Sequence, residues 1–161
     1  MQRKLALTAV LAVAFALGGY AQRQDFSGTW AVDQVATDAV AANTATPPAG
    51  GRGGGGGMGL GGVTIKQTSD SITLVRQGQS GPVTATYKLD GVEQTMPLGE
   101  LTVKAKAKWD GDKIVIETTR SGQDGSPFTS WLTLQLDDKG TLWTEQKGPN
   151  GITKRAFKKT A

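Results

Sequence analysis

The chain contains neither cysteine nor histidine among its 161 residues. Without cysteine it has no disulfides and no thiolate metal ligands. Without histidine it lacks the commonest general base and the commonest metal ligand. The carboxylates at 110, 112, 137 and 138 flank turns, where aspartate serves local hydrogen bonding. We therefore expect no catalytic residues, no metal site and no cofactor, in a protein that is not an enzyme.

Long hydrophobic runs are also absent. The longest, Leu5 to Leu17, is apolar except for Thr8 and is shorter than the roughly 20 residues of a membrane span. A short basic segment at 2–4 precedes it, and small residues follow up to Ala21. This layout is typical of a secretory signal peptide at 1–21, cleaved after Ala21. It predicts a periplasmic or secreted mature protein with no integral membrane span.

The charge is nearly balanced. The formal net charge is +4. Removal of Arg3 and Lys4 with the signal leaves 16 basic and 14 acidic residues, a net charge of +2. Lys104, Lys106 and Lys108 alternate along one segment, as on the solvated face of a strand. The charge pattern predicts no nucleic-acid partner.

The mature chain divides into three parts. Residues 22–33 begin the β domain with its first strand, and 63–161 form its remainder. Between them, residues 34–62 are rich in alanine, proline and glycine, with ten glycines in the thirteen residues of 50–62. We expect a disordered Gly-rich insertion there, containing at most a short helix near 35–42. The glycines lack the lysine and hydroxyl residue of a phosphate-binding loop.

Short runs of alternating polarity, separated by turn residues, fill the rest of the chain. This pattern predicts an all-β fold, an antiparallel up-and-down barrel or strongly curved sheet of about 8–10 strands. No helical periodicity is long enough for the crossovers of a parallel sheet. The candidate strands lie near 26–33, 63–68, 71–77, 82–90, 92–96, 100–109, 112–120, 127–137, 141–147 and 152–159.

Two turns predict strand register. A two-residue turn at 110–111 would pair Ala107 with Ile114. A three-residue loop at 138–140, with its glycine in the left-handed region, would pair Leu136 with Leu142. One sheet face then carries leucines and the other carries tryptophans: Leu132, Leu134, Leu136 and Leu142 against Trp131 and Trp143.

A third turn, at 149–151, reads as a loop of the same three-residue type. It would pair Trp143 with Phe157 and extend the aromatic face onto the last strand. A barrel has one interior, so either the aromatic or the aliphatic face lies inside. The alternation of residues along the strands leaves both arrangements open, because a register shift of one residue moves every side chain of a strand to the opposite face.

The segment Phe26-Ser27-Gly28-Thr29-Trp30 resembles the Gly-x-Trp signature in the first strand of lipocalins and fatty-acid-binding barrels. The resemblance implies that Arg155, in the last strand, packs over Trp30 and closes one end of the barrel. Other stretches are similar to small secreted bacterial lipocalin-like proteins of calycin type: 87–91, 107–112, 131–136 and 157–159.

The aromatic residues are the main candidates for a ligand site, although core packing is the explanation that we favour for most of them. The predicted ligand-binding residues are Tyr87, Trp109, Trp131, Trp143 and Phe157. We expect an exported barrel whose partner is a small hydrophobic molecule. The alternative is a structural or interaction protein of the cell envelope, contacting a glycan or protein through an exposed aromatic face. Outward-pointing tryptophans would favour the alternative.

Overall fold

The computed structural model describes residues 23–43, 62–78, 81–122, 125–149 and 151–160. The predicted signal peptide, its cleavage point and residues 44–61 of the predicted insertion lie outside these ranges.

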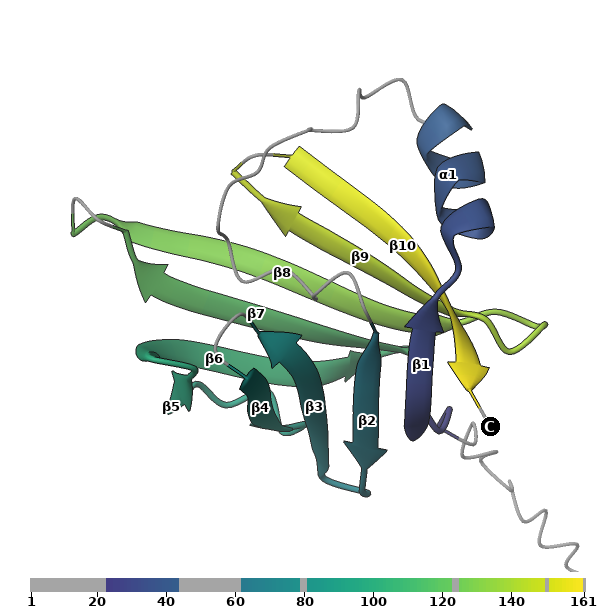
Figure 1. Ribbon diagram of the computed structural model, residues 1–161. Coiled ribbons are helices and arrows are strands. Elements are labelled where there is room, and N and C mark those ends of the chain that lie inside the picture. The colour runs from purple at the N-terminus through teal and green to yellow at the C-terminus, as the bar shows by residue number, and fades with distance from the viewer. Residues whose placement is uncertain (1–22, 44–61, 79–80, 123–124, 150, 161) are drawn as a thin grey trace, which may run out of the picture.

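Ten strands form one antiparallel sheet, which confirms the predicted fold class. The sheet curls into a nearly closed barrel in which β1–β4 cross the strands β6–β10 (Figure 1). The strands are β1 (Gly28–Val32), β2 (Val63–Gln67), β3 (Ser71–Gly78), β4 (Gly81–Lys88), β5 (Gln94–Leu98), β6 (Leu101–Asp110), β7 (Lys113–Ser121), β8 (Pro127–Leu136), β9 (Leu142–Gly148) and β10 (Gly151–Thr160).

The strand order places β4 at one edge of the sheet and β5 at the other. The chain just after β4 links the two edges: Asp90 forms an isolated bridge with Lys108, and the Gly91 N–H donates to the Ala107 carbonyl at 2.9 Å. These contacts hold β4 beside β6 and bring the two halves of the sheet around one interior.

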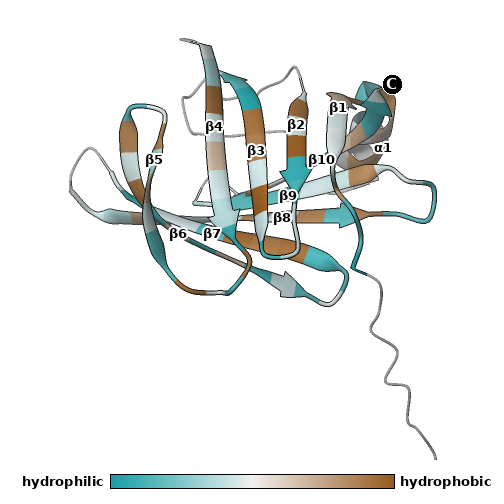
Figure 2. Ribbon diagram, turned by 90° about the horizontal axis from the view of Figure 1, so that it is seen from below, coloured by the Kyte–Doolittle hydropathy of each residue, from teal (hydrophilic) through white to brown (hydrophobic). Residues whose placement is uncertain are grey.

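Apolar side chains alternate with polar ones along the strands, and the apolar ones form the core. Hydrophobic and hydrophilic segments alternate along β3, as expected for a strand with one buried face (Figure 2). Leu134 and Leu142 are fully buried, whereas Trp131 is 36% exposed. The aliphatic face is therefore the barrel interior, and the tryptophan face is the outer surface.

The segment before β1 closes one end of the barrel. Phe26 is fully buried, and its N–H donates to the Gln67 side chain at 3.0 Å. The Trp30 indole N–H donates to the Phe26 carbonyl at 2.9 Å. Gln24 accepts a hydrogen bond from the Leu136 N–H at 3.2 Å, at the end of β8. These hydrogen bonds attach the segment before β1 to β2 and to the end of β8.

The predicted register of the β6–β7 hairpin is wrong by two residues. Asp110 pairs with Lys113, and Ala107 pairs with Ile116 rather than Ile114. The two central turn residues follow Asp110, and the first of them is Gly111, at φ 64°. A shift of two keeps every side chain on its predicted face, because the side-chain period of a strand is two.

The β8–β9 prediction is confirmed, and the β9–β10 prediction is wrong by one residue. Leu136 pairs with Leu142 as expected. In the next hairpin Gly148 pairs with Gly151, so Phe157 lies opposite Leu142 and not opposite Trp143. A shift of one exchanges the faces. Phe157 is consequently inside the barrel and fully buried.

The short helix allowed by the sequence is present as α1 (Gln34–Asn43), outside the barrel next to β10 (Figure 1). Asp33 caps it, since its Oδ1 accepts the Ala36 N–H at 3.2 Å. The other carboxylate oxygen pairs with Lys158 of β10 at 2.8 Å. The Thr37 hydroxyl also accepts the Ala156 N–H at 3.0 Å.

We expect the docking of α1 to weaken at low pH. The hydrogen bond from Lys158, then that from the Ala36 N–H, holds the pKa of Asp33 below its usual value. A lowered pKa stabilises the fold above the unfolded value of about 3.9, and this contribution is lost as pH falls through the folded pKa. Hydrogen-exchange protection factors for α1 should therefore fall between neutral pH and pH about 3.

The variant Asp33→Asn is the matched control for this effect. Asparagine still caps the helix but has no charge for Lys158 and does not titrate. Its protection should be lower than wild type at neutral pH and should lose the acid-dependent step. Equal acid dependence in wild type and Asp33→Asn would contradict the assignment to Asp33.

Candidate ligand site in the barrel interior

A polar row crosses the inner side of the barrel. Gln94 of β5 pairs with Ala105 of β6, which pairs with Thr118 of β7, which pairs with Ser130 of β8. Ala105 is 1% exposed and shares the interior face with the core. The row therefore places an amide and two hydroxyls on the inner side of four adjacent strands.

Tyr87 reaches this row from β4, the strand at the opposite edge of the sheet, which closure of the barrel brings beside β6. It is 4% exposed, and its hydroxyl shares a hydrogen bond with the Thr118 side chain. Burial raises the pKa of Tyr87, while the charge of Arg76 and the bond with Thr118 act in the opposite direction. Arg76 pairs with the buried Val63, so its register position faces inward. Tyr87, Thr118 and Arg76 thus converge inside the barrel.

One polar atom of the row has no partner. The Gln94 Nε2 group is buried and makes no hydrogen bond with any residue that the structure describes. A buried donor without an acceptor costs about 1–3 kcal/mol. An oxygen atom of a bound ligand beside Gln94 would remove that cost.

Two further arginines occupy inward register positions. Arg155 of β10 pairs with Thr144, which is 4% exposed and pairs in turn with the fully buried Leu134. Arg120 follows Thr118 by two residues on β7, and its guanidinium lies 4.6 Å from the Phe128 ring. Guanidinium groups therefore occupy inward register positions on β7 and β10 as well as on β3.

Three of the five predicted ligand-binding residues face the interior. Tyr87 belongs to the polar group, and Phe157 is fully buried in the apolar core. Trp109 packs on Phe26 with ring centroids 6.0 Å apart, and Arg23 lies 5.4 Å over its ring. Trp109 and Phe157 therefore form part of the apolar end, and their contact with a ligand stays a prediction.

The other two predicted residues lie on the outer face. The Trp131 indole N–H donates to Glu117 at 3.1 Å, and Lys147 lies 5.7 Å from its ring. The Trp143 indole N–H donates to Asp137 at 3.0 Å. Neither side chain belongs to an interior site, because the leucines of the same strands fill that side. Their outward direction is the arrangement expected for the surface-contact alternative.

The predicted partner of Trp30 also needs correction. Trp30 is 2% exposed, and the cation over its ring is Lys159, with Nζ 5.6 Å from the ring centroid. Lys159 is the strand partner of Trp30, whereas Arg155 lies four residues earlier, opposite Thr144. Gly28 has φ 139°, and a Cβ there would overlap the Lys159 side chain. Gly28 therefore makes room for the lysine that covers Trp30.

Sequence reasoning missed Arg76, Thr118 and Gln94. The sequence did contain a signal for the first two, because each continues a series of apolar residues spaced two apart. Arg76 follows residues 72 and 74, and Thr118 follows residues 114 and 116. Their charge and polarity suggested solvated positions, and their meeting with Tyr87 depends on contacts between distant strands.

Within the described residues no helix is long and apolar enough to cross a membrane. No cluster of carboxylates suited to a metal ion occurs there either.

The strand order, the inward aliphatic face and the covered tryptophan of β1 define a lipocalin-like barrel. No protein-family model and no curated protein sequence matches the chain. Solved structures do. Apo lipid binding protein 8 of Caenorhabditis elegans superposes with a TM-score of 0.59 at 13% identity, covering 87% of this chain and all of that one.

Two secretory abundant heat soluble proteins from Ramazzottius varieornatus have the same fold. One superposes with a TM-score of 0.55 at 17% identity, over 84% of this chain and 95% of the other. The second, protein 4 of that group, gives 0.53 at 15% identity over 84% and 94%. At these identities the likeness shows the barrel fold.

Proposed function

We propose that this protein binds a small apolar molecule with an acidic end inside its barrel, and that it does so without catalysing a reaction. The observation that carries the proposal is the convergence of Arg76, Tyr87 and Thr118 inside an apolar barrel, next to the unpartnered Gln94 amide. Cationic and hydrogen-bonding groups in a low-dielectric interior favour an anionic acceptor.

The remainder of the interior suits an apolar body. Small buried side chains line the inner side of β4 and β6, at Ala85, Ala105 and Ala107. Ligand pockets are mostly apolar, with a few polar groups that set orientation. We therefore orient the acidic end of the ligand toward the polar row and its hydrocarbon part toward the alanines. The name of lipid binding protein 8 supports this class of ligand.

A dansyl-labelled undecanoic acid tests the proposal. Transfer of the dansyl group from water into the barrel should shift its emission to the blue and increase its intensity, in a saturable manner. Oleic acid should displace the probe, and oleyl alcohol should do so more weakly because it has no charge for Arg76. No change in dansyl emission with the purified mature protein would refute the proposal.

The arginine contribution has its own test. Arg76→Gln should weaken binding of the acidic probe by about tenfold or more, the usual value of a charged hydrogen bond. Lys104→Gln is the matched control, because Lys104 is paired with Glu93 on the outer side of β6 at 3.1 Å. Equal affinities in the two variants would remove Arg76 from the site.

We also propose that the protein acts in the periplasm or outside the cell, on the basis of the apolar segment at 5–17 and the small residues up to Ala21. Intact mass measurement on protein expressed from the full chain should give a mature form that begins at Gln22. Retention of the first 21 residues would contradict export by this signal.

A further inference from the structure

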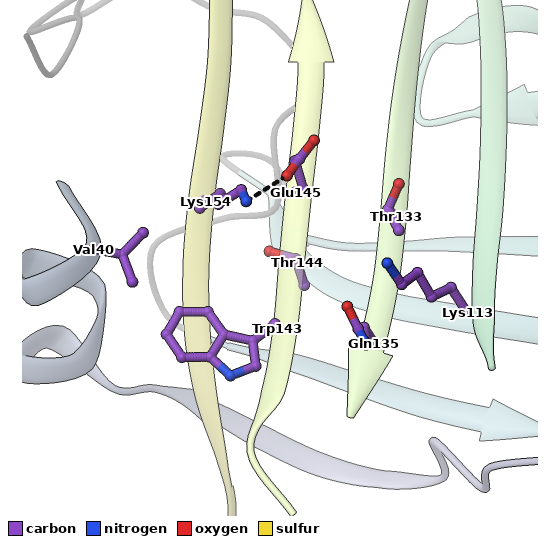
Figure 3. A pocket seen from close by; sticks show the side chains of 8 residues that line it. All are labelled: Val40, Lys113, Thr133, Gln135, Trp143, Thr144, Glu145 and Lys154. Atoms are coloured by element: carbon purple, nitrogen blue, oxygen red, sulfur yellow. Dashed lines mark ion pairs between the residues drawn. The ribbon is translucent and has the colours of Figure 1, made fainter. Parts of the chain in front are cut away.

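A hollow lies on the outer side of the barrel, separate from the interior. It is bounded by β7, β8, β9 and β10 and by the side of α1, and its volume is about 320 Å³ (Figure 3). Small-molecule sites begin at roughly 300 Å³. The hollow is therefore large enough for one compact ligand or for one unit of a chain.

Trp143 of β9 forms an apolar wall of this hollow. Val40 of α1 also lines it, on the side of the helix (Figure 3). The indole is held in place, because its N–H donates to Asp137 Oδ2 at 3.0 Å. Asp137 is held in turn by the N–H groups of Lys139 and Thr141, at 2.9 and 2.8 Å. A flat apolar surface with its orientation already set loses little entropy when a ligand packs on it.

The rest of the lining is polar. Thr133 and Gln135 extend from β8, and Glu145 and Lys154 form an ion pair of 2.9 Å across β9 and β10 (Figure 3). Hydroxyl, amide, carboxylate and ammonium groups thus surround one aromatic ring. This set offers hydrogen-bond donors and acceptors together in a small space.

The lining discriminates between classes of ligand. A wholly apolar molecule would leave these polar groups without water or partners, at a cost in binding energy. A simple anion would make no use of Trp143. Lys154 is already paired with Glu145, so Lys113 of β7 is the one lining cation without an ion pair among the described residues. A sugar ring satisfies both requirements, because it has an apolar C–H face and hydroxyl groups around its edge.

We propose that this outer hollow binds a pyranose unit of a neutral oligosaccharide, with the sugar face on Trp143 and its hydroxyls on Thr133, Gln135 and the Glu145–Lys154 pair. The site is independent of the interior ligand, since the β9 and β10 backbones separate the two. The barrel would then hold a small amphiphile inside and a glycan outside.

Saturation-transfer NMR with cellotetraose, chitotetraose and maltotetraose at millimolar concentration tests the proposal. We expect saturation transfer to the ring protons of at least one of the three, with unchanged affinity when the interior is saturated with oleic acid. Failure of all three sugars to bind overturns the proposal, even if the dansyl probe binds inside. Loss of sugar binding on addition of oleic acid also overturns it.

Variants locate the binding. Trp143→Ala should weaken sugar binding by about tenfold or more. Gln135→Leu, which removes hydrogen bonds and leaves the tryptophan and the core in place, should also weaken it. Trp131→Ala is the matched control, because Trp131 lies on the same outer face but does not line the hollow. Unchanged affinity in Gln135→Leu and Trp143→Ala, or equal loss in Trp131→Ala, overturns the assignment.

Discussion

Replacing Trp30 by alanine should lower the free energy of unfolding by about 3–5 kcal/mol, the range found when large buried aromatic residues are truncated. Trp30 is 2% exposed, and its indole N–H is hydrogen-bonded to the Phe26 carbonyl. The variant would leave a cavity, an unpaired carbonyl and an uncovered Lys159 side chain. Because Trp30 also holds the chain entry in place, the end of the barrel near Phe26 should loosen with it.

Urea unfolding followed by circular dichroism measures this loss. Trp131→Ala is the control of equal size, since Trp131 is 36% exposed on the outer face. We expect it to cost about 1 kcal/mol or less, as surface substitutions usually do. Similar losses in the two variants would contradict the placement of Trp30 in the core and of Trp131 outside it.

Ala105→Trp should abolish binding of the dansyl-labelled acid while the barrel still folds. Ala105 lies between Gln94 and Thr118 in the polar row, so a large side chain there would occupy the proposed ligand volume. If that volume is free in the unliganded protein, the indole fills it with little strain. If it is already filled, overpacking should destabilise the fold by about 1–3 kcal/mol.

Lys106→Trp is the matched control, one residue further along β6. Lys106 lies on the outer face and pairs with Glu117 at 3.0 Å. Its replacement should leave probe affinity unchanged. Retained binding in Ala105→Trp would place the ligand elsewhere, and a strongly destabilised Ala105→Trp would show that the interior has no room for one.

The accuracy of the sequence predictions followed the range of the interactions behind them. The β8–β9 hairpin was predicted correctly because its turn, with Gly140 at φ 74°, involves only neighbouring residues. The β9–β10 hairpin was predicted one residue out, because Gly148 pairs with Gly151 rather than with Ile152. That single step placed Phe157 on the wrong face and left the direction of Trp143 undecided.

The candidate sites depended still more on distant contacts. Arg76, Tyr87 and Thr118 belong to three different strands, and they meet only because the sheet closes on itself. The outer hollow likewise needs α1 beside β10, a contact made through Asp33 and Thr37 that no local pattern indicates. The cation over Trp30 was assigned to the wrong residue for the same reason.

The amino-acid sequence by itself determined the all-β class, the ten strands and their antiparallel order, because alternation and turn chemistry are local properties of the chain. Tertiary structure alone decided which face became the interior, which cation covers Trp30, and which polar groups share the barrel with the core. The physical reason is the side-chain period of two: each strand offers two faces, and only closure of the barrel selects one.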